Sequence, residues 1–260
     1  LFLHKRKSKH KIMKILVCIS SVPDTTAKIN FTADGKSFDK NGVQFVINPH
    51  DEFSLNKAVE LQEKQGATVT ILTVGDATVD PVMRKALAIG ANDGIRIDAD
   101  ARDDFFVATQ IAKAAKDGGF DLVLTGKESI DYNGGSVPGL VAAMLDYGFV
   151  NGCIGLDVEG SSAKAVREID GGKETVEVTL PAVIAGQKGL VDEAALRIPN
   201  MRGIMQARTK QIAVVAPEAT ETKVEVVGYV KPAERGNVTL IDKDNVAELV
   251  RLLHEEAKVI

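Results

Sequence analysis

The segment DLVLTGKESIDYNGGSVPGL, residues 121–140, decides the fold because it joins a buried strand to a helix through a glycine-rich loop. The apolar run FDLVLTG at 120–126 is typical of a parallel strand with both faces covered. Similar runs are KILVCIS at 14–20, TVTILTV at 68–74 and GIRID at 94–98. Helical patterns between the runs cover 51 to about 65, 80–89, 104–116 and 136–145. This alternation predicts an α/β fold with a doubly wound, mostly parallel sheet and helices on both faces.

The pattern changes after Tyr147. KAVREI at 164–169 and TVEVTL at 175–180 flank Asp170-Gly171-Gly172, which predicts a β-hairpin, and AVIAG at 182–186 is apolar enough to return to the core. Residues 187–210 carry few strand signals and predict a long loop that ends in a short helix. Long ordered loops on compact domains are usually functional.

The C-terminal part predicts an arm with a terminal helix. A polar stretch interrupted by proline runs from Pro217 to Arg235, and an apolar stripe returns from Asn245 to about Glu256. Such a helix has little core of its own, so we expect it to dock on a partner. The predicted divisions are an extension at 1–12, a nucleotide-binding α/β domain at 13–216 and the arm at 217–260.

Composition excludes several classes of protein. The chain has 260 residues, 45% hydrophobic and 26% charged, with a formal charge of −4, which argues against a nucleic-acid binder. No run approaches the roughly 18 apolar residues of a membrane span. Cys18 and Cys153 are too few for a disulfide framework, so we expect a reducing cytosol, bacterial rather than the mitochondrial matrix. Residues 1–12 are basic and free of acids, as in an added, disordered extension or a fragment of a targeting peptide.

The loop after the fourth apolar run is the candidate site. Glycines, short polar side chains and a helix start can hold a phosphate on backbone N–H groups, although ordinary turns and caps use the same residues. The chain has no G-x-x-x-x-G-K-[ST] motif and no G-x-G-x-x-G after its first strand. His50 is the one histidine within the core pattern, so no histidine triad or metal cluster is visible. A binding module or carrier is therefore favoured over an enzyme.

Seven segments in order resemble the beta subunit of electron transfer flavoprotein, from Met13 to about Glu256. They are ILVCISSVPD, VINPHDEFSLNKAVEL, KALAIGAND, DLVLTGKESID, VREIDGGKETVEVTLPAVIAG, RIPNMRGIMQARTK and NVTLIDKDNVAELVRLL. The resemblance implies a non-catalytic subunit that pairs with an alpha subunit. The pair holds an FAD, mainly in the alpha subunit, which carries electrons from acyl-CoA and related dehydrogenases to a membrane quinone oxidoreductase.

The resemblance also implies a structural AMP in this chain. The residues carried over by position are Cys18, Asn48, Pro49, His50, Asp51, Val74, Gly126, Lys127, Glu128, Ser129, Ile130, Asp131, Tyr132, Asn133, Gly134, Gly135, Ser136 and Val137. The loop at about 187–210 corresponds to a recognition loop that inserts a leucine into a dehydrogenase, for which Leu190 is our candidate and Leu196 the alternative. Other apolar residues of this segment, Met201, Ile204 and Met205, are expected to pack its short helix.

Two alternatives stay open. Thr25 and the preceding Val22-Pro23-Asp24 resemble the sequence of electron-bifurcating relatives that bind a second FAD in place of AMP. Tyr132 and Ser136 depart from the loop of those relatives, and a bulky Tyr132 would restrict the space for a flavin, which favours AMP. The other alternative is a stand-alone adenine-nucleotide sensor, which would form a homodimer and need no alpha subunit.

Overall fold

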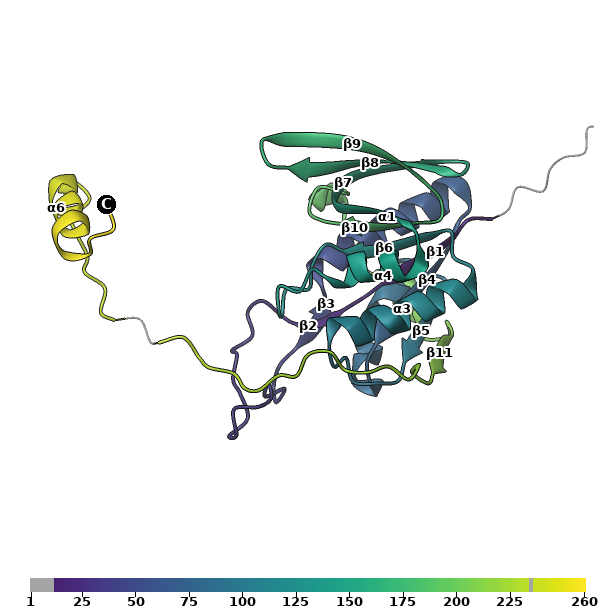
Figure 1. Ribbon diagram of the computed structural model, residues 1–260, viewed down its shortest axis with the longest axis horizontal. Helices are drawn as coiled ribbons and strands as arrows, with labels where there is room; N and C mark the ends of the chain where they lie inside the picture. The colour runs from purple at the N-terminus through teal and green to yellow at the C-terminus, as the bar shows by residue number, and fades with distance from the viewer. Residues whose placement is uncertain (1–11, 234–235) are drawn as a thin grey trace, which may run out of the picture. The chain divides into compact units, whose positions relative to one another are not determined.

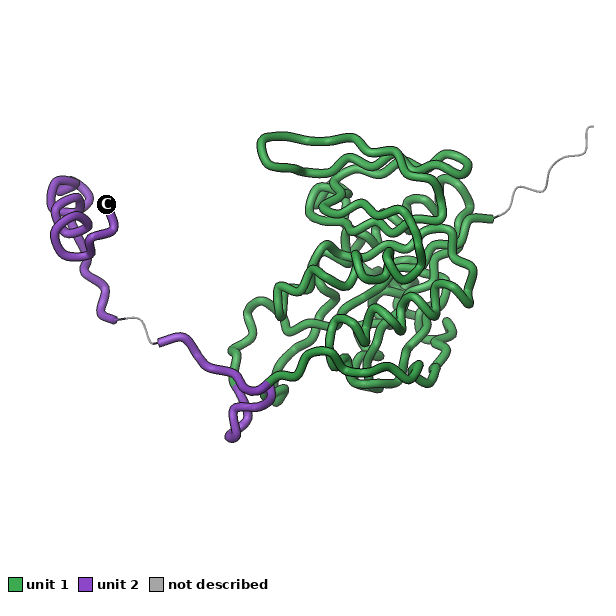
Figure 2. Tube along the Cα trace, in the orientation of Figure 1, with its two compact units in different colours: residues 1–30, 39–226 green, residues 31–38, 227–260 purple. Residues whose placement is uncertain are grey.

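The computed structural model describes residues 12–233 and 236–260, so the expected extension at 1–12 lies almost entirely outside the described residues. The chain divides into two units, coloured separately in Figure 2. One unit contains the residues up to 30 and residues 39–226, and the other contains 31–38 and 227–260. The sheet, its helices and the candidate site all belong to the first unit.

A nine-stranded sheet forms the first unit (Figure 1). Its strands, in spatial order, are β11 (Ile212–Val215), β5 (Asp93–Ile97), β4 (Thr68–Val74), β1 (Lys14–Cys18), β6 (Leu122–Gly126), β10 (Ala182–Gly186), β7 (Gly148–Glu159), β8 (Ser162–Ile169) and β9 (Gly172–Thr179). Neighbouring strands from β11 to β7 pair in parallel, whereas β7, β8 and β9 pair antiparallel. The predicted mostly parallel sheet with a hairpin is confirmed.

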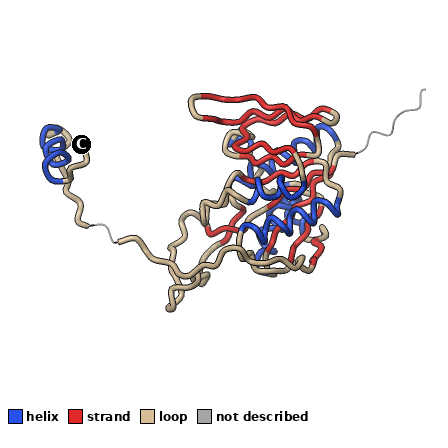
Figure 3. The backbone as a smooth tube through the Cα atoms, in the orientation of Figure 1, coloured by secondary structure: helices blue, strands red, loops and turns tan. Residues whose placement is uncertain are grey.

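Helices cover both faces of the parallel part (Figure 3). They are α1 (Pro49–Gln65) and α2 (Asp80–Ile89) on one face, and α3 (Asp104–Gly118) and α4 (Val137–Leu145) on the other. Helix α1 starts at a proline, carries Asp51 and Glu52 in its first turn and ends at Gly66 in the left-handed conformation. Proline at the start, acids in the first turn and glycine at the end each favour these boundaries.

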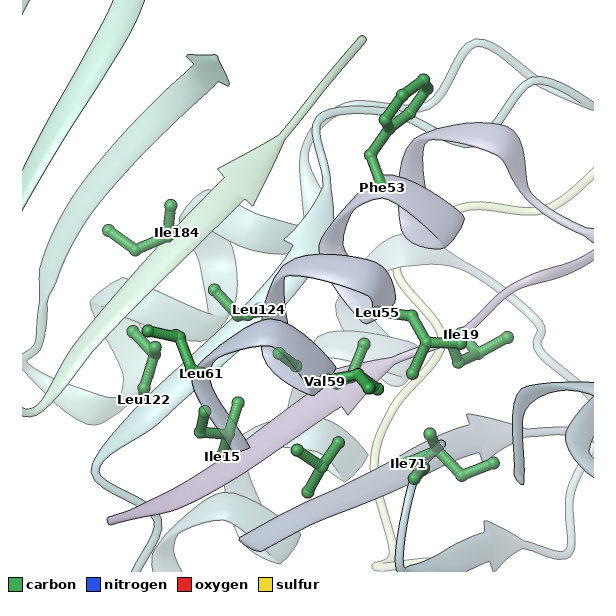
Figure 4. Packing of buried hydrophobic residues seen from close by; sticks show 14 of the residues in the cluster. Ile15, Ile19, Phe53, Leu55, Val59, Leu61, Ile71, Leu122, Leu124 and Ile184 are labelled. Carbon is green, nitrogen blue, oxygen red and sulfur yellow. The ribbon is translucent and has the colours of Figure 1, made fainter. Parts of the chain in front are cut away.

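The core explains why the strand sequences are continuously apolar. Ile15 of β1 packs under α1 together with Leu55 and Val59, as Figure 4 shows. The next residue, Leu16, faces the opposite helices and packs in the cluster of Ala108 from α3. Because successive side chains point to opposite faces, a strand covered on both sides needs apolar residues at every position.

Several strands were not predicted. Strand β7 pairs in parallel with β10 at its start and antiparallel with β8 at its end, with register shifts near Cys153. Gly152 adopts a φ of 65° inside it, so the usual alternation is broken and the sequence signal is weak. The strand β11 and the short antiparallel pair β2 (Ser21–Pro23) and β3 (Phe45–Ile47) were also missed. Three-residue strands carry too few positions to show a period.

The beginning of the arm belongs to the first unit and is held by α3. The side-chain amide of Gln110 in α3 donates to the carbonyl of Glu218 (3.0 Å) and accepts its N–H (2.7 Å). Asp103 caps α3 through the N–H of Phe106 (2.6 Å), and its second oxygen accepts the N–H of Val224 (3.0 Å). Gln110 in α3 and Asp103 at its N-cap therefore fix residues 218–224, because their side chains bond backbone groups of the arm.

The second unit combines two segments that are distant in sequence. Phe31 stacks on Tyr229 with ring centroids 4.8 Å apart, and the N–H of Tyr229 donates to the carbonyl of Gly35 (2.8 Å). The chain ends in α6 (Val246–Arg251), continued by a wider turn at Leu252–Glu256. The predicted terminal helix is confirmed.

Candidate functional site

A cleft opens where the order of the strands reverses. From β1 the chain passes through α1 to β4 and β5 on one side, and then crosses through α3 to β6 on the other side of β1. The switch point therefore lies between β1 and β6, and ligands of such sheets bind in the crevice beyond the carboxyl ends of these strands. The cleft there has a volume of about 1020 Å³, at the upper end of the range for small-molecule sites.

The N-terminus of α1 forms the floor of the cleft. Asp51 is buried, and its carboxylate accepts the N–H groups of Ser20 (2.7 Å) and Gly126 (2.7 Å). Asn48, fully buried one turn earlier, donates to the carbonyl of Glu128 (2.8 Å) and accepts the N–H of Ile130 (3.3 Å). The floor is therefore joined to the ends of both strands and to the loop after β6.

The loop after β6 ends in a helix N-terminus that no side chain caps. The N–H of Ser129 donates to the carbonyl of Gly134 (2.9 Å), which closes the loop before α4 begins at Val137. Ser136 stands at the N-cap, but its hydroxyl donates to the carboxylate of Asp104 instead of to the helix. The N–H groups of the first turn lack a side-chain cap as a result, and such a terminus favours anions.

Burial shifts the titration of three groups at the floor. It raises the pKa of Asp51 to about 7, opposed by the N–H groups that its carboxylate accepts. Burial also raises the pKa of the Cys18 thiol, so this cysteine stays protonated and unreactive. The pKa of His50 is lowered, chiefly by burial and against the attraction of Glu128, whose carboxylate lies 3.4 Å from Nε2.

The charged side chains that line the cleft are mostly acidic. The acids are Asp51, Asp76, Asp100, Asp103, Asp104, Glu128 and Asp131, and the bases are Lys40, Arg102 and Lys223. A phosphate would therefore depend on backbone N–H groups at α4 more than on lysine or arginine. Within residues 12–233 and 236–260, no three potential ligands among His, Cys, Asp and Glu gather as a metal site would require.

Most residues predicted for the nucleotide site line this cleft. Those that line it are Cys18, Asn48, Asp51, Val74, Gly126, Glu128, Ser129, Asp131, Tyr132, Gly134, Ser136 and Val137. The remaining predicted residues, Pro49, His50, Lys127, Ile130, Asn133 and Gly135, belong to the same segments but not to the lining. Whether any of them binds a nucleotide stays a prediction.

One wall of the cleft was not predicted from the sequence. Residues 99–105, which run from the end of β5 into the first turn of α3, line it together with Lys223, Val224 and Val226 of the arm. The only local signal was Asp103, which reads as an ordinary helix cap. Nothing in the sequence indicated that this cap also holds the arm.

The choice of Leu190 as an exposed anchor is wrong for this structure. Leu190 is 5% exposed and belongs to the main core cluster, and Leu196 is half-buried against the same cluster. The N–H of Leu190 closes a tight turn onto the carbonyl of Gln187 (3.1 Å), which directs the side chain inward. Met201, Ile204 and Met205, expected to pack the short helix, are exposed instead, and Ile198 is 89% exposed.

The fold and the cleft define a doubly wound α/β protein with a cleft of small-molecule size at its switch point. The family model of the electron transfer flavoprotein domain matches residues 36–220. The chain is 36% identical over 237 residues to the electron transfer flavoprotein subunit beta of Syntrophomonas wolfei subsp. wolfei, covering 90% of this chain and 92% of that protein. It is 32% identical to the corresponding protein of Bacillus subtilis (95% and 100% covered) and 30% identical to that of Homo sapiens (95% and 99% covered). The chain belongs to the electron transfer flavoprotein family and is similar throughout to its beta subunits.

Proposed function

We propose that this chain is the beta subunit of a heterodimeric electron carrier, without a catalytic site of its own. In this proposal the alpha subunit holds most of an FAD, which accepts electrons from acyl-CoA and related dehydrogenases and passes them to a membrane quinone oxidoreductase. The flavin supplies the redox chemistry, and the protein binds it and tunes its surroundings. The compartment that fits this role is the bacterial cytoplasm. Within the described residues no helix is both long enough and apolar enough to span a bilayer.

We further propose that the cleft binds AMP. The observation that carries this is the uncapped start of α4 at the cleft, where Ser136 bonds Asp104 and leaves first-turn N–H groups for a phosphate. The apolar lining of Leu72, Val74 and Val107 suits the flat faces of an adenine ring. These residues fit a nucleotide, which would act here as a structural ligand.

We assign the docking of a dehydrogenase to the exposed residues of the loop at about 187–210. Ile198 and Met201 have 89% and 73% of their surface exposed, whereas Leu190 is committed to the core. An exposed aliphatic side chain that fills a pocket of a partner is a typical binding hot spot. Ile198 therefore replaces Leu190 as the proposed anchor.

Quantifying the nucleotides released from the purified complex tests the proposal. Mass spectrometry is expected to find one FAD and one AMP for each pair of subunits. Two FAD and no AMP would instead favour the electron-bifurcating alternative, for which the large volume of the cleft leaves room. A chain that purifies as a nucleotide-loaded homodimer, with no alpha subunit, would refute the carrier and favour the sensor.

A further inference from the structure

Asp51 bridges the two strands on either side of the switch point. The parallel pairing of β1 with β6 ends at Val17 and Leu124, and beyond it the strands have no ladder partner for each other. Asp51 supplies acceptors at this position, since Oδ2 accepts the N–H of Ser20 and Oδ1 that of Gly126, both at 2.7 Å. Each carboxylate oxygen therefore already has a backbone donor.

We propose that Asp51 is a positioning residue of the nucleotide cleft, which ties the end of β1 to the end of β6 and so sets the width of the crevice. This inference rests on the proposed nucleotide site, and it changes the role of Asp51 from a ligand contact to a tie between strands. Asp51 is 4% exposed, so little of its carboxylate is accessible to a ligand.

Close packing around Gly126 supports a fixed tie. A Cβ added to Gly126 would lie 2.5 Å from Oδ1 of Asp51 and 2.6 Å from the Cβ of His50. Asn48 acts in the same direction, because its N–H donates to the carbonyl of Ser20 (2.9 Å) while its side chain holds Glu128 and Ile130. The first turn of α1 thus fixes both sides of the crevice through backbone groups.

Neutralising Asp51 should change nucleotide affinity in opposite directions, depending on whether it acts through its charge or as a tie between the strands. A carboxylate repels an anionic nucleotide, so neutralising it should strengthen binding if charge were its only effect. A tie predicts the reverse, because a side-chain N–H in place of Oδ1 or Oδ2 would face a backbone N–H and displace the end of β1 or β6. The cleft would then change width, and we expect the affinity to fall about tenfold or more.

Protonation of Asp51 should act in the same way as its replacement. Its pKa of about 7 means that an O–H would face one of the two backbone donors below neutral pH. The other titratable groups close to it are Cys18 on β1 and the neighbouring His50 on α1, and His50 in turn interacts with Lys127 and Glu128 after β6. Among these, His50 has a lowered pKa and Cys18 a raised one, which separates their titrations from that of Asp51.

Isothermal titration calorimetry of the full chain with AMP and with adenosine, from pH 6 to pH 8, tests the inference. We expect Asp51→Asn to bind both at least about tenfold more weakly than the wild type, with no pH dependence near 7. The wild type and His50→Gln should both bind adenosine more weakly below pH 7 than above it. Since adenosine has no phosphate, titration of a phosphate cannot explain this loss of affinity. Asp76→Asn removes another acid of the cleft but keeps its cap on Thr78, so it should bind AMP no more weakly than the wild type.

Binding by Asp51→Asn as tight as that of the wild type, or tighter, would overturn the inference. Asp51→Glu serves as a second variant, since it keeps the charge, moves the carboxylate by one methylene and should lose affinity to a similar extent. The amide resonances of Ser20 and Gly126 report the tie without any nucleotide, and should titrate near pH 7 in the wild type and in Asp76→Asn but not in Asp51→Asn. Amides that do not titrate refute the tie, whereas a wild type that binds neither AMP nor adenosine refutes the proposed nucleotide site.

Discussion

Replacing Gly203 with alanine should destabilise the protein, contrary to the usual effect of this change in a helix. Gly203 is the third residue of α5 (Met201–Ala207), and its N–H donates to the cap Asn200 (2.8 Å). Alanine normally improves a helix by about 0.5–1 kcal/mol relative to glycine. Here an added Cβ would lie 2.6 Å from the carbonyl oxygen of Ala88 at the end of α2, so the helix has to move away.

The magnitude follows from what holds α5 against α2. Arg84 of α2 donates to the carbonyls of Ala207 (2.7 Å) and Lys210 (2.6 Å), and Lys210 in turn donates to that of Leu87 (2.9 Å). These bonds resist the shift that the new methyl group requires. Overpacking typically costs about 1–3 kcal/mol, and subtracting the helix propensity gain leaves a net loss of up to about 2.5 kcal/mol.

Gly139→Ala provides the matched control for this prediction. Gly139 is also the third residue of its helix, α4, but the nearest atom to its added Cβ is Cε1 of Phe149 at an ordinary 3.6 Å. Urea unfolding should show Gly139→Ala stabilised by about 0.5–1 kcal/mol and Gly203→Ala destabilised. An equal gain in both variants would mean that α5 is not held against α2, and the reasoning would fail.

Three further predictions address the loop, the cleft and pH. Leu190→Ala should lose about 2–5 kcal/mol in urea unfolding, whereas Ile198→Ala should stay within about 0.5 kcal/mol but raise the KM for a partner dehydrogenase; the opposite pattern would restore Leu190 as the anchor. Gly126→Ala should lower the free energy of unfolding by about 1–3 kcal/mol through overpacking. Gly134→Ala should leave it nearly unchanged, because the nearest atom to its added Cβ lies at 3.7 Å. Similar values for the two variants would argue against a closely packed floor of the cleft. Asp51 has a pKa of 3.8 when unfolded and about 7 when folded, so the unfolded state loses its proton first and stability falls as pH rises between these values. The free energy of unfolding of the wild type minus that of Asp51→Asn should therefore fall by up to about 1.36 kcal/mol per pH unit from pH 4 to 7; a difference that rises or stays level would contradict the shifted pKa.

The parts of the fold that could be predicted are those with strong local patterns. Helix α2 was predicted with its observed boundaries, 80–89, because Asp80-Pro81 starts it and Gly90 ends it. The four central strands were visible because burial on both faces makes them continuously apolar. The hairpin strands β8 and β9 and the apolar strand β10 were also predicted, whereas β7 and β11 pair with strands distant in sequence, which no local pattern reveals.

The candidate site was predictable in place but not in its contacts. Parallel strands bring their carboxyl ends to one edge, so the segments around Cys18, Val74 and Gly126 had to meet there. Their hydrogen bonds could not be deduced, because Asp51 in a first helical turn reads as a favourable charge at the helix dipole. Only the structure shows that its oxygens accept N–H groups from two different strands.

The segment 187–210 lacks strand patterns and yet is held at several points. Leu190 is anchored in the core, and the N–H of Arg197 donates to Asn56 (2.9 Å) while its guanidinium pairs with Glu63 (2.6 Å). At its end, Arg84 and Lys210 fix α5 by hydrogen bonds to backbone carbonyls. Ordering a flexible loop at an interface costs about 0.5–1.5 kcal/mol for each immobilised side chain, and a segment tied in this way has already met much of that cost for its backbone. The exposed Ile198 is therefore presented on a preorganised surface. In the proposed docking, the buried Leu190 would contribute by holding the loop in place and not by entering the dehydrogenase.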